Sequence, residues 1–131
     1  GLWPCSCSRA RRMSGERRKA EKLGRRAETL AVWLLRFKGY GIMARRERTP
    51  AGEIDIIARR GRTLVAVEVK ARRAAAPVGD VIGERQWQRI CRALEMYAGR
   101  RRLDHLRLRF DIVFLRPGQW PKHVPDAWRP S

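Results

Sequence analysis

Acidic residues are scarce in this sequence of 131 residues, which has 13 aspartates and glutamates against 31 lysines and arginines. The formal net charge is +18 and the sequence pI is about 11.6. Such a charge attracts polyanions and speeds their association. We therefore expect a nucleic acid as partner, bound with an affinity that falls steeply with salt. An anionic membrane surface is the competing partner, but no amphipathic terminal helix favours it.

Long apolar runs and cysteines are also few. No apolar run approaches the length of a membrane span, and the opening segment lacks the apolar stretch of a secretory signal. We therefore expect a cytoplasmic protein without stable membrane association. Cys5 and Cys7 are too close for an ordinary disulfide framework, and they lack nearby His or Cys partners for a zinc site.

The length predicts a single domain, which we place at residues 16–116. Residues 1–15 mix proline, serine, glycine and arginine without periodicity, which is typical of a disordered basic arm, and Met13 is an alternative start. Residues 117–131 are rich in proline, so we expect a tail without regular structure.

Two segments have helical periodicity. The first spans residues 16–38 and ends at Gly39. Its expected core stripe is Leu23, Ala27, Leu30, Leu34 and Phe37. The second spans residues 80–98, with Asp80 as N-cap and Gly99 as its end. Its stripe is Trp87, Ile90, Cys91, Leu94, Tyr97 and Ala98, which favours core packing of Trp87 over stacking on a base.

Four segments have strand character. Residues 40–47 precede a turn at residues 49–52, and two β-branched runs then follow on either side of Arg60-Gly61-Arg62. The last strand spans residues 106–115, where we expect Asp111 to form a structural ion pair with an arginine rather than to bind a metal. His105 and His123 look isolated and are assigned no role. The order αβββαβ predicts an α/β domain with a mixed, largely antiparallel sheet flanked by two helices.

The two β-branched runs contain Glu53, Asp55, Glu68 and Lys70. Residues two apart share a face of a strand, so Glu53 lies with Asp55, and Glu68 with Lys70. Antiparallel pairing would bring Asp55 beside Glu68. Two neighbouring carboxylates among apolar residues repel each other and are costly to desolvate, and a divalent cation relieves both problems.

The ligand set favours Mg²⁺ or Mn²⁺ over zinc, because no His or Cys accompanies these carboxylates. Such a cation would bind a phosphate oxygen and activate a water molecule. Lys70 would orient that water or offset charge in the transition state. The predicted reaction is phosphodiester hydrolysis.

Asp55 with Glu68-Val69-Lys70 resembles the pattern of the PD-(D/E)xK nuclease superfamily, although Ile54 stands where the usual proline precedes the aspartate. More narrowly, GEIDIIAR, TLVAVEVKARR and RFDIV resemble the YraN-like family of small bacterial proteins, which is similar to archaeal Holliday-junction resolvases. The resemblance covers residues 23–115. It implies a restriction-endonuclease-like core, which agrees with the predicted element order.

The resemblance also implies roles for individual residues. Asp55 and Glu68 would be metal ligands, the carbonyl of Val69 a third, and Lys70 the catalytic cation. Glu28 would complete the site from the first helix, whereas its position beside the apolar stripe equally allows a salt bridge with Arg25 or Lys22. Two departures from the family pattern affect substrate contact: Gln86 replaces the usual lysine, and Ala71 the usual threonine.

Basic residues flank the predicted site on both sides. The residues that we expect to contact phosphates or other parts of the nucleic acid are Arg45, Arg46, Arg48, Arg72, Arg73, Gln86 and Arg89.

The function predicted from these observations is that of a metal-dependent endodeoxyribonuclease of the resolvase-like class, selective for DNA structure rather than sequence, with DNA favoured over RNA. Resolvase action would require a two-fold homodimer, which the sequence does not establish. The main alternative is a non-catalytic nucleic-acid-binding module in which the same carboxylates and lysine form an ion-pair network. A third is an assembly factor that binds RNA through its basic arm.

Overall fold

The computed structural model describes residues 14–71, 82–116 and 118–130. Within them the chain forms two helices and a five-stranded open sheet of order β1-β2-β3-β4-β5. The elements are α2 (Ser14–Phe37), β1 (Gly41–Thr49), β2 (Gly52–Arg60), β3 (Thr63–Ala71), α3 (Glu84–Arg100), β4 (Arg107–Leu115) and β5 (Lys122–Trp128). Strands β3 and β4 are parallel and the other pairs antiparallel, so the predicted α/β class with a mixed, largely antiparallel sheet is confirmed.

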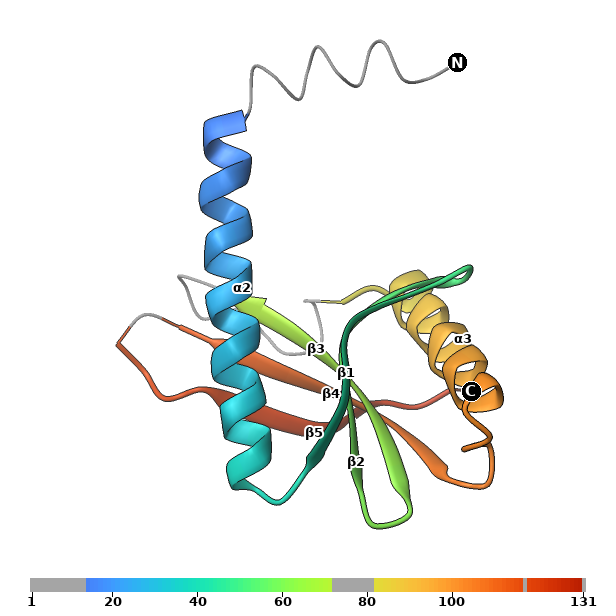
Figure 1. Cartoon of the computed structure of the whole chain (residues 1–131). Coiled ribbons are helices and arrows are strands. Elements are labelled where there is room, and N and C mark those ends of the chain that lie inside the picture. The colour runs from blue at the N-terminus through green and yellow to red at the C-terminus, as the bar shows by residue number, and fades with distance from the viewer. Residues whose placement is uncertain (1–13, 72–81, 117, 131) are drawn as a thin grey trace, which may run out of the picture.

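The sheet separates two hydrophobic cores, with α2 over one face and α3 over the other (Figure 1). Side chains alternate between these faces along β3: Leu64 and Ala66 pack with α3, while Val65 and Val67 pack with α2. A strand that is buried on both faces needs apolar residues at every position, which accounts for the continuous β-branched run. A charged side chain inside this strand is therefore exceptional.

The buried face of α2 differs from the predicted stripe. Ala27, Ala31 and Leu35 face the sheet, whereas Leu30 is 54 % exposed and Phe37 is 93 % exposed. Ala27 and Leu34 of the predicted stripe do pack against the core, but the C-terminal half of the helix is apolar on several sides, so periodicity alone misplaces Leu30 and Phe37. Alanines at the buried positions let the helix approach the sheet closely. The side chain of Leu23 lies outside the described residues.

The second helix has the predicted buried stripe, but it begins and ends at other residues than predicted. All six residues of its expected stripe are buried. Trp87 is 5 % exposed and stacks on Trp128, with ring centroids 5.8 Å apart, so core packing of Trp87 is confirmed. The helix begins after Gly83 and continues through Gly99 to Arg100. Asp80 lies outside the described residues, and Gly99 does not end the helix.

The proline-rich tail contains a strand, contrary to expectation. β5 pairs antiparallel with β4 and extends the sheet beyond residue 116. It contains Pro125, which is compatible with its place at the edge of the sheet because the residue has no N–H to donate. Short proline-rich segments contain little local sequence pattern that indicates a strand. Here the strand forms because the segment pairs with β4.

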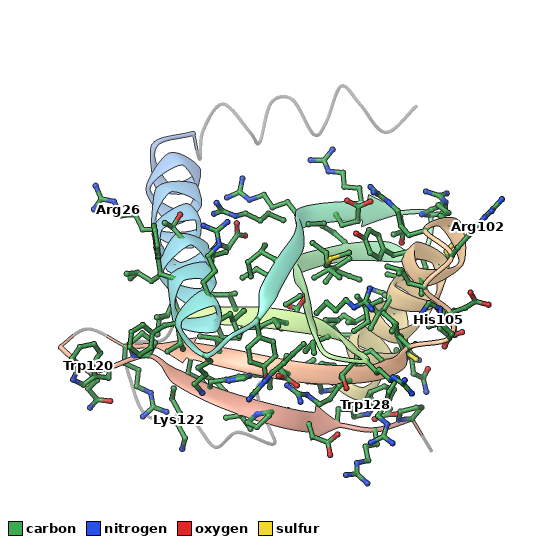
Figure 2. All side chains as sticks on the ribbon, turned by 60° about the horizontal axis from the view of Figure 1, so that its bottom comes forward. Arg26, Arg102, His105, Trp120, Lys122 and Trp128 are labelled. Atoms are coloured by element: carbon green, nitrogen blue, oxygen red, sulfur yellow. The ribbon has the colours of Figure 1, made fainter. Side chains whose placement is uncertain are left out.

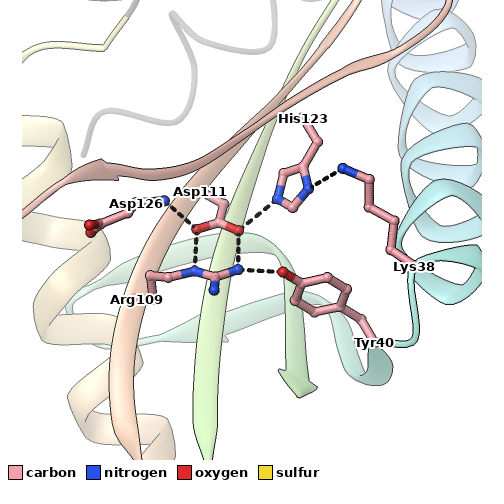
Figure 3. A network of polar contacts seen from close by, with 6 residues as sticks. All are labelled: Lys38, Tyr40, Arg109, Asp111, His123 and Asp126. Carbon is pink, nitrogen blue, oxygen red and sulfur yellow. Dashed lines mark hydrogen bonds and ion pairs between the residues drawn. The ribbon is translucent and has the colours of Figure 1, made fainter. Parts of the chain in front are cut away.

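His123 is not isolated, again contrary to expectation (Figure 3). Its Nε2 lies 2.7 Å from Asp111 Oδ2 and its Nδ1 lies 2.9 Å from Lys38 Nζ. A lysine ammonium only donates, so Nδ1 accepts, and Nε2–H donates to the carboxylate. The Asp111 carboxylate also accepts hydrogen bonds from Arg109 Nε and Nη2 at 2.9 and 2.8 Å. The predicted structural ion pair of Asp111 is thus confirmed.

None of the helices in residues 14–71 and 82–116 is long and apolar enough to cross a membrane.

Candidate active site

An open pocket of about 580 Å³ lies between α2 and α3, at the C-terminal end of β3. Its lining includes eight of the predicted site residues: Glu28, Glu53, Asp55, Glu68, Val69, Lys70, Gln86 and Arg89. They come from α2, β2, β3 and α3, so four separate segments of the chain meet here. The structure therefore brings together the residues that the motifs single out, while their catalytic and binding roles stay predictions.

The β2–β3 hairpin places Asp55 next to Glu68. Its two-residue turn pairs Arg60 with Thr63, and the register continues to Ile56 opposite Val67. One step further, Asp55 and Glu68 would be opposite each other, but the ladder ends before them. Asp55 Oδ2 instead accepts a hydrogen bond of 2.9 Å from the backbone N–H of Val69. The Asp55 carboxylate thus provides the hydrogen-bond acceptor for the Val69 N–H at a point where β2 and β3 no longer pair through their backbones.

Burial and mutual repulsion disfavour the charged forms of both carboxylates. Glu68 is 5 % exposed, and burial, with the nearby Asp55 carboxylate, raises its pKa to about 8. Burial also raises the pKa of Asp55, and the charges of Glu28 and Glu53 add to this effect. The Lys70 ammonium opposes both shifts, and the Val69 N–H opposes that of Asp55. The pocket therefore holds two carboxyl groups whose joint ionisation its single lysine does not fully offset.

This donor set fits a hard divalent cation. Two adjacent carboxylates whose ionisation is unfavourable gain the most from a bound positive charge. Their oxygen atoms suit Mg²⁺ or Mn²⁺, and no histidine or cysteine lines the pocket. Throughout the described ranges, however, no group of three or more His, Cys, Asp or Glu side chains is arranged so that it could hold a metal ion. The fit rests on Asp55 and Glu68 alone.

Glu28, the third acidic residue expected at the site, is paired with a cation. Its Oε2 lies 2.7 Å from Nε of Arg46, and its side chain is 12 % exposed. The sequence-based alternative gave Arg25 or Lys22 as partner, but the side chains of both residues lie outside the described residues. Arg46 holds this position with a positive φ of 50°, which is uncommon for a residue with a side chain. No local sequence pattern indicated this contact between β1 and α2.

The other basic residues predicted to bind nucleic acid differ in their exposure and in their contacts. Arg45 Nη2 donates to Thr29 Oγ1 at 3.1 Å. Arg48 is 88 % exposed and makes a loose contact of 4.0 Å with Glu53. Arg89 is exposed on α3 and lines the pocket. Arg72 and Arg73 lie outside the described residues.

A hydroxyl group that the motifs did not indicate shapes the mouth of the pocket. Thr49 Oγ1 accepts hydrogen bonds from the N–H groups of Ala51 and Gly52 and donates to the Gly52 carbonyl at 2.8 Å. It thereby closes the predicted turn between β1 and β2, as a threonine hydroxyl commonly does in turns. The turn holds Gly52 and Glu53 against the pocket and Arg48 beside them.

Comparison with known proteins places the motifs within one family pattern. The model of the Uncharacterised protein family UPF0102 matches residues 27–115, from α2 to the end of β4. A UPF0102 protein of Parvibaculum lavamentivorans is 53 % identical over 112 residues, which cover 85 % of this chain and 84 % of the relative. A UPF0102 protein of Maricaulis maris is 51 % identical over 120 residues, covering 91 % and 94 %. One of Mesorhizobium japonicum is 46 % identical over 120 residues, covering 91 % and 96 %.

Proposed function

Because this chain belongs to the Uncharacterised protein family UPF0102, the YraN family with its PD-(D/E)xK nuclease-like pattern, we propose that it is a metal-dependent endonuclease that hydrolyses phosphodiester bonds of DNA. The observation that carries the proposal is the pair of adjacent, largely buried carboxylates of Asp55 and Glu68, which lie beside Lys70 in an open pocket. The cost of ionising both carboxylates is difficult to explain for a purely structural pair.

The side-chain oxygens of Asp55 and Glu68 would hold Mg²⁺ or Mn²⁺, with the Val69 carbonyl as the expected third protein ligand. When bound, the cation supplies Lewis-acid stabilisation of a phosphate and a water of lowered pKa. The Val69 N–H donates to one oxygen of Asp55 and so holds this carboxylate against β3.

Lys70 acts on the charge that develops during hydrolysis. It shares the pocket with both carboxylates, and its charge favours their ionised forms. A compact ammonium at this place orients the attacking water or offsets negative charge on the phosphate in the transition state. The position of Lys70 two residues after Glu68 keeps both side chains on the same face of β3.

Cations at the mouth of the pocket hold the DNA backbone. Arg48 is highly exposed, Arg89 approaches the β1–β2 turn, and both lie within reach of a phosphate chain that enters the pocket. Such contacts position a nucleic acid without reading its sequence. The proposal is accordingly a nuclease selective for DNA structure and acting in the cytoplasm. Cutting both strands of a junction would require a two-fold homodimer, which sedimentation or native mass measurement tests.

A non-catalytic nucleic-acid-binding module is the second candidate, and one contact favours it. Arg46 forms a salt bridge with Glu28. The acidic residue expected from α2 is therefore neutralised by a side chain of the protein itself. In that case the carboxylates and basic residues stabilise the hairpin and the cations bind nucleic acid without cleavage.

Cleavage assays separate the two candidates. Labelled duplex, flap and four-way-junction DNA is incubated with the wild-type protein and with Asp55→Asn and Glu68→Gln, with and without Mg²⁺ or Mn²⁺. Glu95→Gln, which removes an exposed carboxylate of α3 outside the pocket, is the matched control. We expect metal-dependent cutting by the wild type and the control, and none by the two site variants, which keep their DNA affinity. Binding by every variant without any cutting would refute the nuclease and favour the binding module.

A further inference from the structure

A second group of basic residues lies at the other end of the sheet. Residues 59–63 and 100–107 contain seven arginines and a single carboxylate, Asp104. The two segments meet, because the Arg107 N–H donates to the Arg62 carbonyl at 2.8 Å. We define the distal arginine cluster as its six exposed members: Arg60, Arg62, Arg100, Arg101, Arg102 and Arg107.

The elements that carry the cluster meet at the end of the sheet opposite the C-terminal end of β3 (Figure 1). It is built from the β2–β3 turn, the C-terminal end of α3 and the start of β4, whereas the pocket lies at the C-terminal end of β3 and beside the first turns of α3. Thr63 and Lys70 of β3 are seven positions apart, a distance of about 23 Å at roughly 3.3 Å per residue. The cluster is therefore not part of the catalytic pocket.

Salt bridges do not neutralise the positive charge of the cluster within the described part of the chain. None of its guanidinium groups forms a salt bridge there, while Arg46, Arg109 and Arg129 each pair with a carboxylate. Two members are instead held over aromatic rings: Arg60 lies 5.4 Å from the ring centre of Tyr40 and Arg101 lies 5.3 Å from that of Tyr97. Stacking of this kind orients a guanidinium group while leaving its charge unneutralised.

Arg102 occupies a backbone position that disfavours it. Its φ is 57°, in the left-handed region just after the end of α3, where glycine is the common residue. Figure 2 shows its side chain at the α3 end of the molecule, on the side opposite Arg26 of α2. The backbone conformation favours glycine here, so it does not account for the charged side chain of Arg102.

We propose that the distal arginine cluster is a second phosphate-binding surface, which takes the backbone of a DNA duplex held at the catalytic pocket. The proposal rests on the proposed function, since it extends the same substrate to a second contact. Successive phosphates of a strand are about 3.4 Å apart along the duplex axis, so about seven base pairs separate the two contacts. The edge strand β1, with Arg45 and Arg48, lines the route between them. The preferred substrate thus has a duplex arm that extends at least about seven base pairs from the cut site.

Binding measurements without metal test this surface independently of cleavage. The anisotropy of a labelled 24-bp duplex is followed in EDTA from 50 to 300 mM KCl. The test variant combines Arg62→Gln, Arg100→Gln and Arg107→Gln. The control combines Arg26→Gln, Arg92→Gln and Lys122→Gln, which removes the same charge from exposed positions outside both sites.

The cluster variant is expected to lose at least tenfold in affinity at 100 mM KCl. Each lost phosphate contact reduces the slope of log K against log salt by about 0.9, so three contacts reduce it by about 3. The control is expected to change the slope by less than about 1, because it affects only the long-range field. Equal losses in the two variants, or no loss in either, would overturn the proposal while leaving the proposed function intact. A wild-type protein that binds no duplex at 50 mM KCl would also overturn this proposal, whereas the cleavage assay with metal decides the proposed function.

Arg102→Gly provides a second and independent test. Glycine relieves the left-handed backbone position and removes one charge, so we expect a melting temperature that is unchanged or higher together with weaker DNA binding. Weakened binding by a variant that is no less stable cannot be attributed to unfolding. Full DNA affinity in Arg102→Gly would count against a role of this residue in the surface.

Discussion

Replacement of Asp111 by asparagine should strongly destabilise the fold. The Asp111 carboxylate is fully buried and accepts hydrogen bonds from Arg109, from His123 and from the backbone N–H of Asp126 at 2.9 Å (Figure 3). An asparagine of the same shape has one oxygen and one NH₂ group, so at least one of these donors would face another donor. Arg109, whose side chain is 24 % exposed, would also lose its counter-charge.

The expected loss follows from the burial of the pair. Removing one partner of a buried ion pair costs about 3 to 5 kcal/mol, and the partial exposure of Arg109 places this case near 3 kcal/mol. For a domain of this size, 1 kcal/mol corresponds to about 4 °C in melting temperature, so we expect a decrease of about 12 °C. Thermal unfolding followed by circular dichroism at pH 7 measures it, with Asp104→Asn as the control for loss of an exposed carboxylate.

The pH dependence provides a second check on the same residue. Burial alone would raise the pKa of Asp111, but the hydrogen bonds from His123, Arg109 and Asp126 hold it below its ordinary value of 3.8. A carboxylate with a lowered pKa stabilises the fold above its unfolded pKa, and this contribution is lost as the pH falls through the folded value. The difference between wild type and Asp111→Asn should therefore narrow as the pH falls below 3.8. A variant that melts within about 3 °C of wild type at pH 7 would refute the reasoning.

Three further predictions concern the pocket and Cys91. Without metal, Glu68→Gln should raise the melting temperature at pH 9 more than at pH 5. Burial raises the pKa of Glu68 to about 8, and the stabilising protonated form is lost as the pH rises through that value. Identical effects at both pH values would contradict this. Arg46→Gln should increase Mn²⁺ affinity in calorimetry by freeing Glu28, whereas Arg45→Gln, which leaves the Glu28 pair in place, should not. Cys91 should resist alkylation at pH 8 until the protein unfolds, since burial and the Glu95 carboxylate raise its pKa to about 12; peptide mass analysis identifies the labelled cysteine.

Much of the candidate site was predictable because its geometry is local. The turn at Gly61 and the alternation of the flanking runs set the register of the β2–β3 hairpin, and this register is what brings Asp55 next to Glu68. Lys70 follows from the same alternation. The apolar stripe of α3 is equally a property of its own segment, so its six members could be read from helical spacing.

Contacts between distant segments had no such signal. Arg46 reaches Glu28 from another element, and His123 meets Lys38 across 85 positions of sequence. These partners are chosen by how α2 and β5 dock on the sheet, and nothing in the neighbouring residues indicates them.

The sequence by itself therefore determined the first four strands, the hairpin register and the residues available for chemistry, because period, turn residues and charge act within a few positions. Tertiary structure alone decided which side of α2 is buried, that residues 122–128 become a strand, and that Glu28 is held by an arginine. Each of these depends on a partner brought close by packing, and the free energy of burial that selects the partner is a property of the assembled core.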